Sequence, residues 1–222
     1  MKLRKSENLF VLGIFLAFTG LISATALAVV SNLTSPAIAA AKEKQTAAAL
    51  KQIGLPEFNN HPAGNICKLK TADGDEVSFL GAAMDGKLVG IAARTSVSGY
   101  AGAIKVMAGL DLDGNILAVI VEEHKETPGL GANVCDRKFQ RTIRQLTNPN
   151  PDLLPSNPIL DQFHGRRAVP GRRWAVKTDG GEFEYRTGAT VTSRAVTRAV
   201  NRIASLFLQK KAAITAKLSE QK

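Results

Sequence analysis

The sequence is poor in aromatic residues and lacks a concentrated group of metal-binding side chains. Aromatic residues make up 5% of the 222 positions and are not interleaved with basic residues as in proteins that stack nucleic-acid bases. The two cysteines, Cys67 and Cys135, are far apart, with neither a CxxC motif nor a nearby histidine cluster. This arrangement argues against zinc or iron–sulfur ligation and leaves two alternatives, a disulfide in an oxidising compartment or two separate buried thiols.

Signature motifs of nucleotide-binding and hydrolytic folds are also missing. The chain contains no G-x-G-x-x-G fingerprint and no serine in a G-x-S-x-G elbow. His124 stands near Glu122, Glu123 and Glu126, but one histidine among carboxylates on a charged loop is more typical of a solvated surface than of a metal or acid–base site. The other two histidines lie in expected loops without a partner set. Hydrolase and metal chemistry therefore have little support.

The formal net charge of +10 is unevenly distributed along the chain. From Arg186 to the C-terminus there are eight Lys/Arg residues and one Glu, a net charge of +7, while the middle of the chain is nearly balanced. A charge confined to a terminal helix, in a chain with few aromatic residues, argues against a nucleic-acid partner. That basic helix and the Pro-rich segment 148–170 remain candidate docking surfaces.

A long uncharged run follows the basic N-terminus. Residues 9–30 read LFVLGIFLAFTGLISATALAVV, and as a helix these 22 residues span about 33 Å, enough for a hydrocarbon core of about 30 Å. Residues 24–28 resemble a signal-peptide cleavage site, but the apolar run exceeds the 7–15 residues usual in such peptides, so we expect a retained helix. The basic N-terminus is expected to stay cytoplasmic, which places the rest of the chain outside the cytoplasm, at a bacterial inner membrane.

Past the anchor, the pattern predicts an α+β fold, with an antiparallel sheet flanked by helices. Apolar segments at 76–82, 88–95, 104–110 and 116–122 read as strands, and the Asp-Gly pairs between them favour hairpins. Further segments are expected as follows: helices at 36–55, at 133–146 and from 192 onward, loops at 57–68 and 148–170, and a last strand at 172–176. The expected domain organisation is a cytoplasmic segment 1–8, a transmembrane helix 9–31, a helical linker 32–60, a domain 61–210 and a polar tail 211–222.

Two motifs are candidates for ligand binding. Residues 186–196 read RTGATVTSRAV, with four hydroxyl residues around a Gly-Ala pair just before a helical pattern. Hydroxyls and free backbone N–H groups at a helix start favour a phosphate or another anion, although Thr192 or Ser193 could equally serve only as the helix N-cap. Residues 124–131 read HKETPGLG, which is either a tight loop or a loop that lays its backbone against a flat ligand.

These motifs, together with the anchor, resemble the FMN-binding subunits of ion-translocating electron-transport complexes. The resemblance is nearer to the G subunit of the Rnf complex and more distant to the C subunit of the sodium-pumping NADH:quinone reductase. It rests on GYAGAIKVMAGLDLDGNILAVIVEEHKETPGLG at 99–131, on FEYRTGATVTSRAVTRAV at 183–200, and on the single N-terminal membrane helix.

The resemblance implies that a flavin transferase joins FMN, through its phosphate, to Thr190 at the end of the T-G-A-T motif. It assigns the neighbours of that threonine to recognition and capping, and the earlier loop to the wall of the flavin; these residues are Thr187, Gly188, Ala189, Thr192, Ser193, Glu126, Thr127, Gly129, Leu130 and Gly131. The flavin ring, rather than an acid or base of the protein, then carries the electron chemistry. One position departs from the family pattern, because Glu184 stands where an Asp is frequent.

The sequence therefore predicts a membrane-anchored flavoprotein subunit that relays electrons through covalent FMN and turns over nothing alone. Its expected partners are the membrane, other membrane subunits of a larger complex and the flavin transferase. Two alternatives remain: an FMN-domain subunit of another respiratory or regulatory membrane system, and a non-flavin extracytoplasmic binding module in which T-G-A-T only caps a helix. Mass analysis for a covalent flavin separates the flavoproteins from the last alternative.

Overall fold

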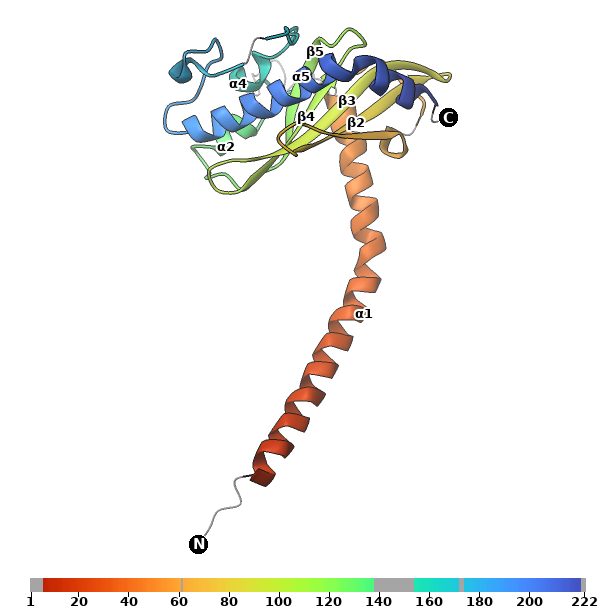
Figure 1. Ribbon diagram of the computed structural model, residues 1–222, viewed down its shortest axis with the longest axis vertical. Helices are drawn as coiled ribbons and strands as arrows, with labels where there is room; N and C mark the ends of the chain where they lie inside the picture. Colours follow the sequence, from red (N-terminus) through yellow and green to blue (C-terminus); the bar gives the residue numbers. More distant parts are fainter. Residues whose placement is uncertain (1–5, 61, 138–153, 172–173, 221–222) are drawn as a thin grey trace, which may run out of the picture. The chain divides into compact units, whose positions relative to one another are not determined.

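The structure is a computed structural model that describes residues 6–60, 62–137, 154–171 and 174–220 (Figure 1). The chain divides into two compact units, Met1–Gln45 and Thr46–Lys222. The first unit contains most of helix α1 (Ser6–Gln52), and the second contains the sheet and the remaining helices.

The first unit is an apolar helical stretch. Within α1, the segment Phe10–Ile38 is long and apolar enough to cross a membrane. Its large side chains, among them Phe10, Phe15 and Leu21, are exposed rather than packed on a protein core. Such outward-facing apolar side chains suit a lipid environment, which agrees with the predicted N-terminal membrane helix. The helix continues through Pro36 to Gln52, so residues 53–60 of the expected linker lie outside it.

A five-stranded antiparallel sheet forms the centre of the second unit. Its strands follow chain order: β1 (Ile66–Lys70), β2 (Glu76–Met84), β3 (Lys87–Ser98), β4 (Ala103–Leu110) and β5 (Ile116–Glu123). Asp85 and Gly86 join β2 to β3 with φ values of 51° and 77°, the geometry that a two-residue hairpin of the primed type requires. The four predicted strands are confirmed, while β1 corrects the expectation of a loop at 57–68.

The two faces of the sheet carry different helices because strand side chains alternate between the faces. Helix α5 (Thr190–Glu220) covers one face, where Phe79 and Phe207 lie with ring centroids 6.2 Å apart (Figure 1). On the other face, Leu50 in the last turn of α1 and Ile53 just after the helix belong to the same buried cluster as Leu80 and Met107.

Residues 211–220 continue helix α5 and contribute two buried side chains to the core, which corrects the expectation of a polar tail for this described part of 211–222. Helix α5 bends at Lys210, where φ is −120° and ψ is 19°, and it continues to Glu220. Ile214 and Leu218, four residues apart on one helix face, are buried. The side-chain amide of Asn65 donates a 2.7 Å hydrogen bond to the carbonyl of Leu218, which fixes the end of the helix next to β1.

Short elements fill the region between β5 and α5. They are α2 (Ala132–Cys135), α4 (Pro158–Asp161) and η2 (Lys177–Asp179), preceded earlier in the chain by η1 (Pro62–Gly64). The helix expected at 133–146 is described only to residue 137, and most of it, like residues 148–153 of the expected loop, lies outside the described residues. The strand expected at 172–176 is wrong for its described part, since Val176 forms only a single bridge with Phe183.

An aromatic cluster holds the segment before α5 against the domain. The rings of Phe163 and Phe183 lie 4.8 Å apart, and those of Trp174 and Phe183 lie 5.1 Å apart. All three side chains are buried. This packing positions the chain that leads into the T-G-A-T motif.

Candidate functional site

Thr190 is the first residue of α5, two residues earlier than the sequence pattern indicates. Gly188 precedes it with φ of +79°, a left-handed conformation that glycine adopts readily, and Ala189 N donates to Arg186 O at 2.9 Å. The backbone N–H groups of residues 190–192 have no acceptor among the described residues. The Thr190 side chain therefore belongs to the helix turn whose free N–H groups attract anions.

Ser193 closes the turn that presents Thr190. Its hydroxyl donates to Ala189 O at 3.0 Å and accepts from Arg186 N at 3.1 Å, and the side chain is fully buried. The hydroxyl thus binds the residues before the helix rather than the free N–H groups of its first turn. Ser193 is not an N-cap in the usual sense, and its role is to hold the T-G-A-T turn in place.

A buried hydrogen bond joins the two sequence motifs. Thr192 Oγ1 donates to Glu126 Oε2 at 2.6 Å, while Glu126 Oε1 accepts from Tyr100 N at 2.8 Å and from Ala101 N at 3.1 Å. The Glu126 side chain is 5% exposed, and its charge is balanced by these three donors. The sequence did not indicate the role of Tyr100 and Ala101, because they contribute backbone groups.

Glycines make room for this carboxylate. A Cβ at Gly131 would overlap Glu126 Oε2 and would lie 2.8 Å from Thr192 Oγ1. A Cβ at Gly99 would overlap Glu126 Oε1 as well. Both positions lie in the 99–131 motif, so the motif's glycines permit the carboxylate to reach the start of α5.

The loop after Glu126 forms a compact turn with an exposed apolar side. Thr127 O accepts from Leu130 N at 3.2 Å and from Ala132 N at 3.1 Å, and Gly129 has φ of +82°. Leu130 is 48% exposed, and its side chain lies beside Gly188, since a Cβ added there would be 3.4 Å from Leu130 Cδ2. The flavin-wall residues predicted at 126–131 are thus next to the T-G-A-T turn.

His124 has a positioning role in this loop. Its Nδ1 accepts from Glu126 N at 3.2 Å, and its Nε2 lies 2.8 Å from Asp136 Oδ1. Since Nδ1 accepts, the neutral ring carries its hydrogen on Nε2, toward the aspartate. Among the described residues no group of three or more His, Cys, Asp or Glu side chains could hold a metal ion.

The two cysteines are free and buried, which decides between the two alternatives left by the sequence. Burial, followed by the charges of Glu126 and Asp136, raises the pKa of the Cys135 thiol to about 12. The thiol is therefore protonated at neutral pH and is a poor nucleophile.

Glu184, the departure from the family pattern, is on the surface. Its carboxylate pairs with Lys177 and its side chain is 57% exposed, while its N–H donates to Gln162 Oε1 at 2.6 Å. The longer side chain is therefore accommodated without burial, and its carboxylate is accessible to another protein.

Chemically, the site is suited to binding rather than to acid–base catalysis. It combines a half-buried threonine and free N–H groups at the start of a 31-residue helix with two exposed apolar side chains, Leu130 and Val191. The N–H groups fit a phosphate, and the apolar side chains fit a flat ring system. The residues present therefore fit FMN.

The sequence is similar to those of known proteins. Residues 99–205 match the model of the FMN-binding domain family. The G subunit of the ion-translocating oxidoreductase complex of Cereibacter sphaeroides is 34% identical over 210 residues, which cover 93% of this chain and 87% of that protein. The subunits of the same name from Photorhabdus laumondii and Escherichia coli K12 are 33% and 32% identical, over 89% of this chain and 88% and 89% of theirs.

Proposed function

Because this chain belongs to the family of the G subunits of ion-translocating oxidoreductase complexes, and contains an FMN-binding domain, we propose that it carries FMN covalently on Thr190. The chain is a membrane flavoprotein of electron transport. The proposed linkage is a phosphoester between Thr190 Oγ1 and the flavin phosphate. A flavin transferase would form it from a flavin dinucleotide. The Thr190 hydroxyl oxygen would bond to the flavin-side phosphorus while the P–O bond of the pyrophosphate breaks, so that the nucleoside monophosphate leaves and the hydroxyl proton passes to solvent.

The observation that carries the proposal is the different exposure of the four hydroxyls. Thr192 is 1% exposed and donates to Glu126, and Ser193 is 0% exposed and holds the preceding turn. Thr187 is exposed but precedes the helix by three positions. Thr190 alone combines partial exposure with a place in the first turn of α5, where the helix dipole and free N–H groups stabilise a phosphate.

The remaining site residues would position the flavin. Glu126 holds the loop of Thr127, Gly129 and Leu130 against the start of α5, and this loop supplies the apolar side on which a ring can lie. When bound, the flavin supplies the redox chemistry, and the protein supplies the phosphate anchor and the ring's surroundings. No residue of the site is assigned as a proton donor or acceptor.

We further propose that the helix within 9–31 is retained in the inner membrane with its basic N-terminus in the cytoplasm. The flavin domain would then lie on the periplasmic side and exchange electrons with other subunits of the complex. The relatives are named as one subunit of a complex, which supports a partner-dependent role over that of an independent enzyme. Identification of the membrane subunits that co-purify with the chain separates this role from a role in another respiratory system.

Intact-mass analysis of the full-length chain, co-expressed with its flavin transferase, tests the linkage. The proposal requires the mass of one covalently added FMN, absent from Thr190→Ala and kept in Thr187→Ala. A fluorescent band on a denaturing gel gives the same answer more cheaply. An unmodified wild-type mass beside an active transferase would overturn the proposal, and so would a flavin retained in Thr190→Ala.

A further inference from the structure

Tyr100 is the one exposed aromatic residue among the described residues of the second unit. Its side chain is 75% exposed, whereas the described phenylalanines and the tryptophan of this unit are buried or half-buried, as is Tyr185. A ring that is left in water forgoes the free energy that its burial would release. Since single exposed apolar residues are common on protein surfaces, the position of Tyr100 in the fold decides whether its exposure has a role.

The turn that carries Tyr100 is held at the candidate site by one carboxylate. Glu126 Oε1 accepts from Tyr100 N at 2.8 Å, and Glu126 Oε2 accepts from Thr192 Oγ1 at 2.6 Å. The same carboxyl group therefore joins the backbone of Tyr100 to the first turn of α5, which begins with Thr190. A Cβ at Gly99 would overlap Glu126 Oε1, so the glycine before Tyr100 permits this close approach.

Two further exposed apolar side chains belong to the segments that Glu126 connects. Leu130 is 48% exposed and lies beside Gly188, and Val191 is 45% exposed in the first turn of α5. Tyr100 is thus one of three exposed apolar side chains at the same site, rather than a scattered surface residue. Its turn is already fixed by hydrogen bonds, so covering the ring costs little conformational entropy of the backbone.

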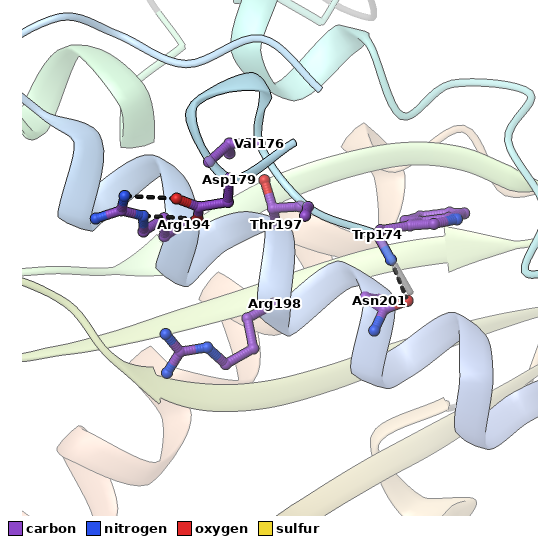
Figure 2. Close-up of a pocket in the computed structure, with 8 residues that line it drawn as sticks. Trp174, Val176, Asp179, Arg194, Thr197, Arg198 and Asn201 are labelled. Carbon is purple, nitrogen blue, oxygen red and sulfur yellow. Dashed lines mark hydrogen bonds and ion pairs between the residues drawn. The ribbon is translucent and has the colours of Figure 1, made fainter. Parts of the chain in front are cut away.

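Trp174, the single tryptophan, belongs to a different part of the domain. It is 6% exposed, and its ring packs with those of Phe163 and Phe183. Its backbone N–H donates to Asn201 Oδ1 at 3.4 Å, as Figure 2 shows. Asn201 follows Thr190 by eleven residues, or about 16 Å along α5. Trp174 is therefore neither exposed nor next to the T-G-A-T turn.

We propose that Tyr100 is a flavin-binding residue whose ring lies against the isoalloxazine, while Leu130 and Val191 supply aliphatic contacts. The inference rests on the proposed attachment of FMN to Thr190, which places the flavin beside the turn that carries Tyr100. Contacts between aromatic rings add binding free energy beyond the area that they bury. Tyrosine also provides a large contact area with few rotatable bonds. Tyr100 would restrict the flavin ring to one position and shield it from water.

Flavin emission tests this contact, because a phenol that touches an excited flavin quenches its fluorescence. Full-length protein that carries FMN, as verified by intact mass, is measured folded in detergent and again after unfolding in guanidinium chloride. The ratio of folded to unfolded emission does not depend on the flavin content of a sample. Tyr100→Leu should raise this ratio about twofold or more, since it removes the aromatic contact. Tyr100→Phe should also raise it, because the phenol is lost, whereas the matched Tyr185→Phe should leave it unchanged.

Nitration of tyrosine by tetranitromethane gives a second readout that does not depend on emission. Tyr100 should be nitrated severalfold more slowly in protein that carries FMN than in protein made without the transferase, while Tyr185 should react alike in both. Peptide mass analysis measures both rates.

The two proposals fail in distinguishable ways. On protein whose mass shows the FMN, an unchanged emission ratio in both Tyr100 variants would overturn the contact and leave the attachment standing. Equal nitration of Tyr100 with and without FMN would do the same. An unmodified mass beside an active transferase would overturn the attachment and the contact together.

Discussion

Thr192 donates a 2.6 Å hydrogen bond to Glu126, which lies 66 residues earlier in the chain. The same carboxylate accepts two backbone N–H groups from the turn that connects β3 and β4. Three segments distant in sequence therefore meet at one side chain next to the start of α5. The stability of the proposed flavin site should depend on this carboxylate although it touches no reacting atom.

A double-mutant cycle on Glu126 and Thr192 should measure that dependence. We expect Thr192→Val to lower the free energy of unfolding by about 1–3 kcal/mol, because it deletes a bond to a charged acceptor. In the double variant with Glu126→Gln, the loss of unfolding free energy should be smaller, by about 1 kcal/mol, than the sum of the losses in the two single variants. Urea unfolding of the full-length chain in detergent gives the values. The distant pair Glu126→Gln and Thr215→Val should be additive, and additivity in the first pair would contradict the contact.

Gly131→Ala should destabilise the site for a steric reason. Gly131 has φ of −61° and ψ of −34°, which alanine adopts without strain, but its Cβ would overlap the Glu126 carboxylate. We expect a loss of about 2 kcal/mol or more. In Gly129→Ala the new side chain has open space, but the left-handed backbone conformation at this position is unfavourable for alanine. The free energy of unfolding should therefore fall by about 1 kcal/mol. Thermal unfolding of the two variants distinguishes overlap from backbone strain, and equal losses would contradict the overlap.

The stability of the domain should depend on pH through Glu122. Burial raises the pKa of its carboxyl above the usual 4.5, although Arg94 lies 3.8 Å away. Because its pKa is raised in the folded state, the Glu122 carboxyl contributes stability that is fully present below its unfolded pKa. This contribution is lost as pH rises through the folded pKa. Glu122→Gln should therefore melt a few degrees higher than the wild type at pH 7, with a difference that vanishes toward pH 4. A lower melting temperature at pH 7 would show that the ion pair with Arg94 outweighs burial.

Arg137 should not tolerate replacement by lysine. Its guanidinium donates to the carbonyls of Val119 and Pro155 and pairs with Asp161 at 2.6 Å, and its side chain is 9% exposed. A lysine ammonium cannot reach these acceptors together, so we expect Arg137→Lys to lose about 3 kcal/mol. Exposed Arg167→Lys is the control, with an expected change below about 0.5 kcal/mol. Denaturant unfolding measures both losses, and equal losses in Arg137→Lys and Arg167→Lys would contradict the prediction.

Local pattern predicted most of the sheet but not its first strand. The strands from β2 to β5 are apolar runs, and Asp-Gly turns separate β2 from β3 and β4 from β5, so periodicity and turn chemistry both indicate strands here. Strand β1 is a five-residue edge strand with two lysines, and its pairing with β2 adds stability that the sequence alone does not display. The buried C-terminal segment was missed similarly, since Ile214 and Leu218 are only two apolar residues in a basic stretch.

The sequence singles out the side chains of the candidate site, but it does not show how they are connected. The motifs placed Glu126, Thr190 and Thr192 near a ligand, whereas the bond between Glu126 and Thr192 depends on how the loop and α5 pack together. The sequence predicts a helix start at 192 because Thr192 and Ser193 resemble N-cap residues. In the structure the Ser193 hydroxyl accepts from Arg186 N instead of capping the first turn, and the helix begins at Thr190. The sequence does not indicate the N–H donors of Tyr100 and Ala101, because every residue type except proline carries a backbone N–H group.

The strand order has a consequence for how the protein matures. Each strand of the sheet pairs only with its chain neighbours, so these contacts close short loops and form early in folding. Helix α5 follows the whole sheet in the chain, and its far end is fixed by the contact between Asn65 and Leu218. The turn that presents Thr190 is therefore complete only after α5 has been made and has packed on the sheet. Flavin attachment at this threonine would be a late step in assembly and a marker of a finished fold.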